Sequence, residues 1–432
     1  MKNLSALFFY VVPLAIILAV YLRRRARAHA HHTLRLREAI DAGLTEPPSL
    51  HPVIDPNRCI GSGGCAKACP ESALGIIHGK AQLVDPSVCI GHGACAAACP
   101  LEAITLVFGT ERRGIDIPYI KPNFESNVPG LFIAGELGGM GLIRKAAEQG
   151  RQAIGSIGGI ARGGADLDVV IVGAGPAGIA AGLGAIQRKL KYVMIEQEDA
   201  LGGTVYHYPR HKIAMTAPVK LPLIGKVKMR EITKEALLDF WQGVVNKTGL
   251  KIRFNERMKA IKRSSRGFVV ETTRGAYTAG AVLLAIGRRG TPRKLGVPGE
   301  ELPKVVYRLL DTDQYRGKRV LVVGGGDSAV EAALALAAEP RVEVKLSYRG
   351  SALSRIKLKN RKRLEEALAK RRVELLLGSN IQSINPASVS LSAGDRNFDV
   401  RNDSVIVCAG GELPTELLKQ VGIEFETKHG TA

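Results

Sequence analysis

Six of the chain's seven cysteines lie between positions 59 and 99, in two copies of one pattern thirty residues apart. The copies read C-I-G-S-G-G-C-A-K-A-C-P and C-I-G-H-G-A-C-A-A-A-C-P. Thiols gathered this closely in a chain of 432 residues indicate a metal centre, because the disulfide frameworks of secreted proteins occur in short chains and spread their cysteines widely. The candidate metal ligands are Cys59, Cys65, Cys69, Cys89, Cys95 and Cys99.

Each copy resembles the bacterial ferredoxin run C-x2-C-x2-C-x3-C-P, with the second cysteine replaced by Ser62 in one copy and by His92 in the other. The resemblance implies two 4Fe-4S clusters, and it implies that the last cysteine of each copy serves the cluster of the other copy. One cluster would take Cys59, Cys65 and Cys99, with Ser62 at the fourth iron. The other would take Cys89, Cys95 and Cys69, with His92 at the fourth iron.

The two replacements leave alternatives open. His92 is a competent nitrogen ligand that would raise the cluster potential, whereas Ser62 is a poor ligand unless it is deprotonated. A 3Fe-4S cluster or a labile fourth iron is therefore the alternative at Ser62. A cluster-free scaffold is disfavoured because six unused thiols would be a liability, and a zinc site is disfavoured because C-x5-C-x3-C fits tetrahedral zinc less well.

A first glycine-rich loop follows the β-branched run at 168–172 and precedes a predicted helix at 179–189. A second strand at 192–196 ends in Glu196, eighteen residues after the last glycine, where an acid binds ribose hydroxyls. The loop predicts a dinucleotide pyrophosphate at the start of the helix. Its candidate cofactor-binding residues are Gly173, Gly175, Pro176, Ala177 and Gly178.

A second loop follows the strand at 319–323 and again opens a helix. Its candidate binding residues are Gly324, Gly326, Asp327, Ser328 and Ala329. The next strand, at 342–347, leads to Arg349 and Arg355 rather than to an acid. Cations there suit the 2′-phosphate of NADP, so NADPH is the predicted coenzyme and NADH stays the alternative.

Two such folds, the second carrying Gly-Gly-Gly-Asp-Ser-Ala, resemble the thioredoxin-reductase-like flavoproteins over residues 112–432. The resemblance implies FAD in the first fold, NAD(P)H in the second, and Gly203 and Thr204 near the flavin. Dithiol members carry Cys-x-x-Cys before the second loop, and this chain has none there. Because disulfide exchange by that route needs two thiols, the ferredoxin–NADP reductase branch is the better match. Cys408 is then expected to be a buried strand residue.

The flavin-contacting segment that normally ends such chains resembles residues 127–150 of this one. The resemblance implies flavin contacts from Gly135 and Glu136 and a helix from Leu142 to Ala153 aimed at the flavin. A glycine-rich linker at 155–165 then leads into the first strand, so we expect a circularly permuted FAD domain. An ordinary amphipathic helix of the ferredoxin domain is the alternative.

The chain's beginning predicts a membrane anchor. Asn3 to Leu22 are twenty uncharged residues, about 30 Å of helix, which matches the bilayer core. The arginines that follow, at 23, 24, 25 and 27, place the rest of the chain in the cytoplasm, bound to the inner membrane by a single span. A buried core helix is the alternative. The net charge of +21 then suits anionic lipid, cofactor phosphates and an acidic partner; nucleic acid is disfavoured because no binding motif accompanies it.

The predicted fold class is α/β, with two Rossmann-like dinucleotide-binding domains, an α+β ferredoxin-like domain and one transmembrane helix. The predicted parts are a span at 3–22, a juxtamembrane linker at 23–48, the iron–sulfur domain at 49–110, the transposed segment at 111–154, the glycine linker at 155–165, the FAD domain at 166–300, the NAD(P)H domain at 301–403 and a return at 404–432.

We expect electrons to pass from NADPH to FAD, to the clusters and to an electron-accepting protein or a quinone. The alternatives are a small-disulfide or quinone reductase and a membrane-bound redox sensor with little turnover. A homodimer stays open by analogy with the family.

Overall fold

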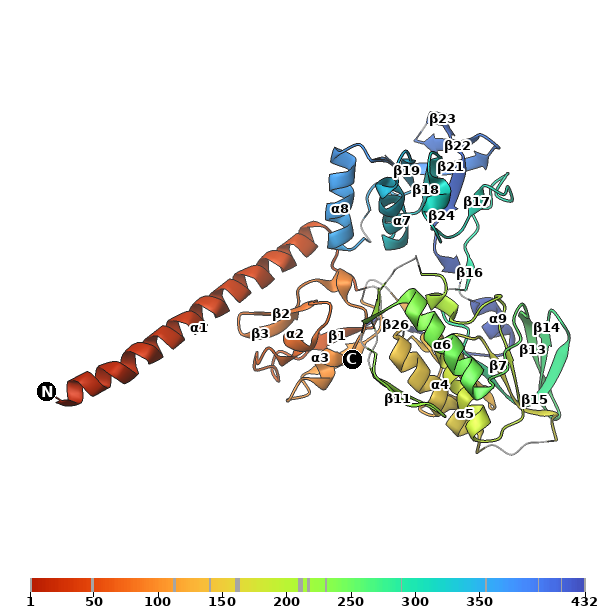
Figure 1. The fold of residues 1–432 in the computed structure, drawn as a ribbon, viewed down its shortest axis with the longest axis horizontal. Coiled ribbons are helices and arrows are strands. Elements are labelled where there is room, and N and C mark those ends of the chain that lie inside the picture. The colour runs from red at the N-terminus through yellow and green to blue at the C-terminus, as the bar shows by residue number, and fades with distance from the viewer. Residues whose placement is uncertain are drawn as a thin grey trace. The chain divides into compact units, whose positions relative to one another are not determined.

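The structure is a computed structural model, drawn as a ribbon in Figure 1. It describes residues 2–47, 50–111, 114–139, 141–159, 164–208, 213–215, 218–229, 231–288, 290–353, 356–394, 396–412 and 414–430. The chain divides into two compact units. The first comprises Met1–Gly114 with Lys428–Ala432, and the second comprises Ile115–Thr427.

The first unit contains the cysteine repeat as two structural copies. Its strands are β1 (His51–Ile54), β2 (Leu74–Ile77), β3 (Lys80–Leu83) and β4 (Ile104–Val107), and β1 pairs antiparallel with β4 as β2 does with β3. The short helices α2 (Gly64–Ala68) and α3 (Ala94–Ala97) each start after a glycine in the left-handed region, Gly63 (φ 74°) and Gly93 (φ 76°). Only glycine takes that turn without strain, so the repeat builds the same cysteine-bearing turn twice.

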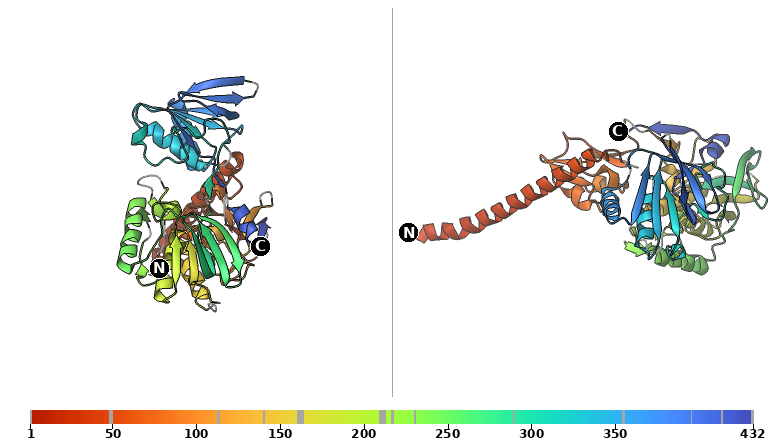
Figure 2. Two further views of the ribbon diagram at one scale, coloured as in Figure 1. Left: turned by 90° about the vertical axis from the view of Figure 1, so that its right-hand side faces the viewer. Right: turned by 90° about the horizontal axis from the view of Figure 1, so that it is seen from above.

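Helix α1 (Lys2–Asp41) is one continuous helix of 40 residues (Figure 2). Its second half packs on the iron–sulfur module. The His32 ring lies against Gly75, where a β-carbon would stand 2.6 Å from the ring, and His32 Nδ1 lies 3.1 Å from the Ile76 backbone nitrogen. Arg35 donates to the Ser72 carbonyl at 2.8 Å and pairs with Asp85 at 2.8 Å. Within the stretch for which the sequence predicts a juxtamembrane linker, residues around 32–35 are thus helical and pack on the module.

The side chains of residues 2–9 lie outside the described part of α1. Among the residues whose side chains the structure describes, no helix is both long enough and apolar enough to cross a membrane.

The FAD-type half of the second unit is built on a six-stranded sheet. The order is β13-β14-β15-β7-β8, and β6 also pairs with β15. These strands are β6 (Leu131–Ile133), β7 (Leu167–Val172), β8 (Tyr192–Ile195), β13 (Met258–Ser264), β14 (Gly267–Thr272) and β15 (Ala276–Leu284). Strands β6, β7 and β8 join their neighbours in parallel, and β7 is buried along its length after Asp168, as its apolar run predicts.

The segment that the sequence predicts to be transposed contributes to this sheet and its core. Strand β6 pairs with β15 from Val282 to Leu284, and Ala153 and Ile154 of α4 (Ile143–Ile157) pack in the same cluster as α5 (Pro176–Gln187). Helix α4 ends at Ile157 rather than at Ala153, so the first residues of the expected glycine linker are helical. Residues 160–163 of that linker lie outside the described part.

The NAD(P)H-type half has a parallel sheet in the order β17-β24-β18-β19-β20. Its strands are β17 (Val305–Val306), β18 (Arg319–Val323), β19 (Glu343–Tyr348), β20 (Val373–Leu377) and β24 (Ser404–Val407), with helices α7 (Asp327–Ala338) and α8 (Leu358–Ala369). An antiparallel sheet adds β21 (Ser379–Ile384), β22 (Ser388–Ala393) and β23 (Arg396–Arg401). Strands β16 (Thr291–Pro292) and β25 (Gly411–Glu412) pair where the chain leaves and re-enters the first half.

The remaining elements complete the second unit. They are β5 (Ile115–Pro118), β9 (Ile213–Met215), β10 (Val219–Leu221), β11 (Gly225–Val227), β12 (Glu231–Thr233), α6 (Lys234–Thr248), α9 (Thr415–Gln420) and β26 (Phe425–Lys428). Strand β26 pairs antiparallel with β5, and the Tyr119 amide donates to the Glu424 carbonyl at 2.8 Å. The beginning and the end of this unit therefore lie side by side.

Candidate functional site

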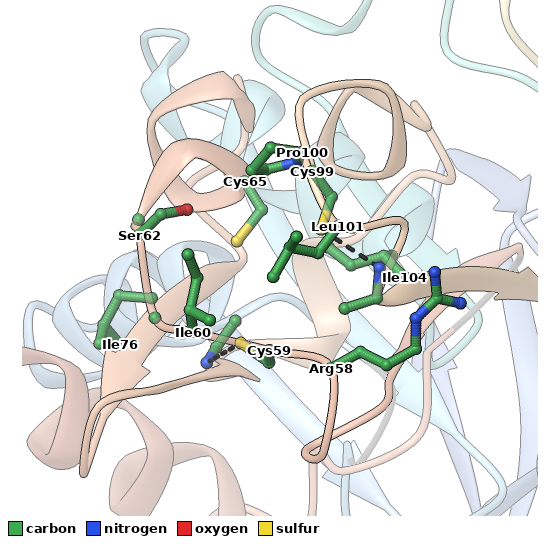
Figure 3. A pocket seen from close by; sticks show the side chains of 14 residues that line it. Arg58, Cys59, Ile60, Ser62, Cys65, Ile76, Cys99, Pro100, Leu101 and Ile104 are labelled. Atoms are coloured by element: carbon green, nitrogen blue, oxygen red, sulfur yellow. Dashed lines mark hydrogen bonds between the residues drawn. The ribbon is translucent and has the colours of Figure 1, made fainter.

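Three thiols and one hydroxyl line a cavity in the iron–sulfur module (Figure 3). They come from Cys59, Ser62, Cys65 and Cys99, and they surround about 330 Å³ of space that no atom fills. The first three belong to the first sequence copy and Cys99 closes the second. Two sulfurs accept backbone hydrogen bonds, Cys59 from Ala81 at 3.4 Å and Cys99 from Ala103 at 3.3 Å. Cys59 and Ser62 lie in the turn before α2, Cys65 lies in α2, and Cys99 follows α3.

A matching cavity of about 360 Å³ is lined by Cys69, Cys89, His92 and Cys95. Here Cys69 comes from the first copy and the others from the second, and the Cys69 sulfur accepts from the Ala73 amide at 3.4 Å. The structure thus groups the six cysteines in the two crossed sets that the ferredoxin resemblance implies. Ser62 and His92 occupy corresponding places beside their respective thiols.

The donor sets fit iron–sulfur clusters. Burial raises the pKa of Cys65 and of Cys95, and it raises the pKa of Cys89 to about 11. Thiols in such places ionise when a cation replaces the proton. Within the described residues, no group of three His, Cys, Asp or Glu side chains is arranged to hold one metal ion. Three thiols spread around each cavity suit a group of several iron and sulfide atoms instead.

The first glycine loop is tight. Gly173 has a φ of 107°, and a β-carbon there would lie 2.5 Å from the Ala285 carbonyl oxygen. A β-carbon at Gly178 would lie 1.8 Å from the Gly173 oxygen, so α5 starts directly under the loop. Gly175 is the residue before the helix, and Pro176 opens it with the φ that a first helical position needs. The start of α5 therefore lies where a helix N-terminus can bind a pyrophosphate.

Glu196 lies at the end of β8, where the sequence predicts it. It is only 6% exposed, and its carboxylate accepts from the Ala174 amide at 2.6 Å and from the Glu198 amide at 3.1 Å. Burial raises the pKa of Glu196, and the hydrogen bonds from the two backbone amides oppose that rise. A carboxylate that also contacts the glycine loop is held in one position beside any bound dinucleotide.

Residues far apart in sequence meet at this loop. A β-carbon at Gly135 would lie 3.1 Å from the Ala177 Cβ, and one at Gly203 would lie 3.1 Å from the Gly175 Cα. The Glu136 carboxylate and the Thr204 hydroxyl each lie 3.9 Å from the β-carbon position of Gly287. The predicted residues of the transposed segment and of the 203–204 turn are therefore brought to the loop.

Leu142 is the residue before α4 and is half-buried. Its carbonyl accepts the Ala146 amide at 2.8 Å, which closes the first turn of that helix. The structure therefore places Leu142 at the helix start, as the sequence predicts, and its flavin contact stays a prediction.

Two further residues at this site escaped the sequence reasoning. Gln149 accepts the Gly135 amide at 2.8 Å, and Gly150 packs against the Ala177 carbonyl. Both stand in the predicted helix, at the spacing that turns them to the same side as Ala146 and Ala153. The glycine inside an otherwise regular helix is the signal that marks a close approach.

The second loop has the same construction. Gly324 has a φ of 148°, and a β-carbon there would meet the Cys408 carbonyl oxygen at 2.5 Å. Gly326 precedes α7, Ser328 is exposed on its first turn and Ala329 is buried beneath it. Asp327 does not face outward: its carboxylate accepts from the Lys357 amide at 2.9 Å and from the Asn360 side chain at 2.7 Å. It orients the loop after β19.

An aromatic ring covers part of this loop. A β-carbon at Gly325 would meet the Tyr348 ring at 2.2 Å, and one at Gly350 would meet it at 2.6 Å. Arg349 is exposed beside that ring, and Arg355 lies outside the described residues. In the sequence Tyr348 is only a neighbour of Arg349, and the packing alone shows that it lies on the glycines.

Cys408 is the seventh cysteine and lies directly after β24. Burial raises the pKa of its thiol to about 12. The other six cysteines line the two cavities of the first unit. The second unit therefore has no second cysteine to form a dithiol with Cys408.

Comparison with known proteins identifies both parts of the chain. Residues 170–431 match the family described as pyridine nucleotide-disulphide oxidoreductase, and residues 51–100 match the 4Fe-4S dicluster domain. The chain is 28% identical over 268 residues to the bacilliredoxin reductase of Bacillus subtilis, covering 60% of this chain and 82% of the relative. It is 29% identical over 273 residues to a ferredoxin–NADP reductase of Pediococcus pentosaceus, covering 61% and 78%.

A solved structure is similar as well. The bacillithiol disulfide reductase of Staphylococcus aureus has a TM-score of 0.51 and 25% identity, over 59% of this chain and 80% of that one. The cysteine repeat is matched separately, by the dicluster domain. The chain therefore belongs to the pyridine nucleotide-disulphide oxidoreductase family, and it is an NAD(P)H- and FAD-dependent oxidoreductase that carries a two-cluster iron–sulfur domain.

Proposed function

We propose that the protein passes electrons from NADPH through FAD to its own iron–sulfur module, and from there to an electron-accepting protein or a quinone. The observation that carries this proposal is the order of the chain. The cysteine module ends near residue 110, and Gly135 and Glu136 already lie at the FAD-type loop. One polypeptide segment thus leads from the thiol cavities to the flavin site.

The chain's residues would hold each cofactor in a defined way. The turn from Gly173 to Gly178 would take the FAD pyrophosphate, and Glu196 the ribose. The turn from Gly324 to Ala329 would take NADPH, with Arg349 at the 2′-phosphate. When bound, flavin accepts a hydride from the nicotinamide and releases electrons singly, which iron–sulfur clusters carry one at a time.

The experiment is stepwise reduction under anaerobic conditions. Purified protein with measured FAD, iron and sulfide is mixed with NADPH, and flavin absorbance and cluster EPR spectra are followed together. We expect bleaching of the flavin followed by EPR signals from reduced clusters. A flavin that is reduced while no cluster signal ever appears would contradict the proposal.

A second candidate is reduction of a small disulfide. The names of two relatives, bacilliredoxin reductase and bacillithiol disulfide reductase, favour it. The second unit supplies only Cys408, whose thiol is buried, so that unit has no dithiol relay of its own. Turnover of oxidised glutathione or cystine that persists after both clusters are removed with a chelator would favour this candidate.

We further propose that the first part of α1 attaches the protein to the inner membrane, with the catalytic part in the cytoplasm. The uncharged run from Asn3 to Leu22 and the arginines after it support this. In the described part of the helix, the large apolar side chains from Tyr10 to Leu22 are exposed except that of Val12, with Tyr10 at 77% and Leu14 at 66%. Alkaline extraction tests it: the full chain should stay in the membrane pellet, and a chain without residues 2–22 should not.

We also propose that the FAD domain is circularly permuted. The pairing of β5 with β26 supports this, because it puts the first and last strands of the unit side by side. The pairing of β6 with β15 supports it too, since the segment before β7 completes the sheet. A rearranged chain that joins Thr427 to Ile115 and opens between residues 159 and 164 should still bind FAD, and loss of FAD from a folded product would contradict the proposal.

A further inference from the structure

The two thiol cavities are counterparts that differ at matched positions. Ser62 corresponds to His92, and Leu101, which follows the closing Cys-Pro of one cavity, corresponds to Glu71 in the other. Arg58 lines the first cavity and corresponds to Val88 in the second copy. The first cavity thus has a cation and an extra apolar side chain at its rim, whereas its counterpart has a carboxylate.

The cavities also differ in exposure. Ser62 and Arg58 are both exposed, and the two apolar rim residues are exposed as well, Ile60 at 68% and Leu101 at 41%. In the counterpart, Ile90, His92 and Glu71 are all partly buried. Small groups in solvent therefore reach the first cavity more easily than the second.

The groups at this rim are not engaged elsewhere. No hydrogen bond or ion pair joins the Ser62 hydroxyl or the Arg58 guanidinium to any residue that the structure describes. Figure 3 shows the Ser62 hydroxyl on the side of the Cys65 sulfur, among the side chains that line the space. Both groups are thus accessible to something that enters the cavity.

The ligand available at the fourth iron of each cluster decides which small groups can bind in its cavity. Iron of a cluster binds soft thiolates well, and an imidazole nitrogen is also competent, so His92 fills the fourth position of its own cavity. A neutral serine hydroxyl is a hard and weak ligand, so the matching position beside Ser62 is left to a stronger donor. An anion is repelled by Glu71 in one cavity and attracted by Arg58 in the other.

We propose that the cavity of Cys59, Cys65 and Cys99 binds a small exogenous thiolate that carries a carboxylate, at the iron position beside Ser62. The thiol gives its proton to solvent, a sulfur–iron bond forms, and a bound water or the Ser62 hydroxyl is displaced, with no change in electron count. Arg58 pairs with the carboxylate, and Ile60 and Leu101 contact the carbon chain. This rests on the proposed assignment of the two cavities to iron–sulfur clusters.

The test titrates the reduced, cluster-loaded full chain with 3-mercaptopropionate and, separately, with cysteamine, while EPR spectra are recorded. We expect 3-mercaptopropionate to shift one of the two cluster signals with saturation. Ser62→Cys should abolish the shift by supplying an internal thiolate, and the matched control His92→Cys should retain it. Ser62→Ala, which removes only the hydroxyl, should bind the thiolate at least as well as the parent.

Arg58 gives a second readout. Arg58→Gln should weaken the binding of 3-mercaptopropionate up to about fivefold, as expected for an exposed ion pair. It should leave the affinity for cysteamine unchanged. The proposal is overturned if cluster-loaded parent protein shows no shift, if Ser62→Cys still shifts, or if His92→Cys alone removes the shift. Absence of iron and sulfide from the protein would instead overturn the electron-transfer function, and this proposal with it.

Discussion

The carbonyl oxygen of Ala177 lies so close to Gly150 that a β-carbon at position 150 would stand 2.0 Å from it. Ala177 belongs to the glycine loop at the start of α5, and Gly150 lies in α4, which precedes that loop in the chain. The missing side chain lets two helix backbones come together. This contact joins the segment before β7 to the first glycine loop.

Gly150→Ala should therefore weaken both the fold and FAD retention. The added methyl group has backbone atoms as its neighbours, which cannot rotate away, and overpacking of this kind costs about 1–3 kcal/mol. The ratio of flavin to protein absorbance after purification and the thermal unfolding midpoint measure the effect. Gly155→Ala in the same helix is the control: only the flexible Arg188 side chain is near it, so its Tm should be unchanged or raised. Equal behaviour of the two variants would contradict the argument.

The crossed cysteine sets predict which cluster each cysteine supports. Cys99→Ala should remove the cluster of Cys59 and Cys65, although Cys99 lies in the other sequence copy, and should leave the cluster beside His92. Cys69→Ala should do the reverse. Iron content should fall by about half in each variant, and EPR should show which signal is lost. Loss of the signal of the cysteine's own sequence copy would contradict the grouping.

Arg349→Gln should change the choice of coenzyme. The exposed guanidinium directly follows β19, where it would pair with the 2′-phosphate of NADPH. We expect the KM for NADPH to rise about tenfold, equivalent to about 1.4 kcal/mol, while the KM for NADH stays the same. Steady-state kinetics with both coenzymes measure this. An equal rise for both would mean that Arg349 acts on the loop in general.

Cys408 should resist alkylation in the folded protein. Burial raises the pKa of its thiol to about 12, so at pH 8 the reactive thiolate is present in only about one molecule in ten thousand. Iodoacetamide labelling followed by mass spectrometry should find Cys408 unmodified until the protein is unfolded. Rapid labelling of folded protein would show that β24 opens.

Asp403 should stabilise the fold of the NAD(P)H-type half at neutral pH and lose this effect at acidic pH. Its carboxylate accepts from the Arg319 side chain at 2.7 Å and 3.0 Å, and this hydrogen bonding lowers the pKa of Asp403 to about 2. Because the folded-state pKa is depressed, the stabilisation is complete above the unfolded value near 4 and is lost as the pH falls towards 2. Urea unfolding of Asp403→Asn and the parent should differ at pH 7 and differ less at pH 3. The same difference at both values would exclude this linkage.

Much of the architecture was predictable because its signals are local. Each of these motifs is recognised from residue spacing within its own short segment. They are the six cysteines, the two glycine loops and the acid at the end of β8, and each lies on the element expected for it. The NAD(P)H-type loop follows in the same way, whereas Cys408, expected within a strand, lies directly after β24. The family and the cofactors then follow from the two kinds of motif in one chain.

Other features depended on contacts between distant segments. For the second half of α1 the sequence predicts only a juxtamembrane linker, yet His32 fits against Gly75, some forty residues away. Asp327, a predicted coenzyme-binding residue, accepts hydrogen bonds from the loop beyond β19, which its place in the sequence does not show. In both cases the contacting partner is decided by tertiary packing. Such packing produces no periodic pattern or residue spacing that could be recognised in the sequence.

By itself, then, the sequence determined the kinds of chemistry: thiols for clusters, glycine turns for two dinucleotides, and a cation for NADPH. Only the tertiary structure decided which groups share a site, such as Glu136, Thr204 and Gly287 at the flavin loop, or Ser62 and Arg58 at one cavity and His92 and Glu71 at the other. The physical reason is that backbone turns depend on a few adjacent residues, whereas the sharing of a cavity depends on how whole elements pack.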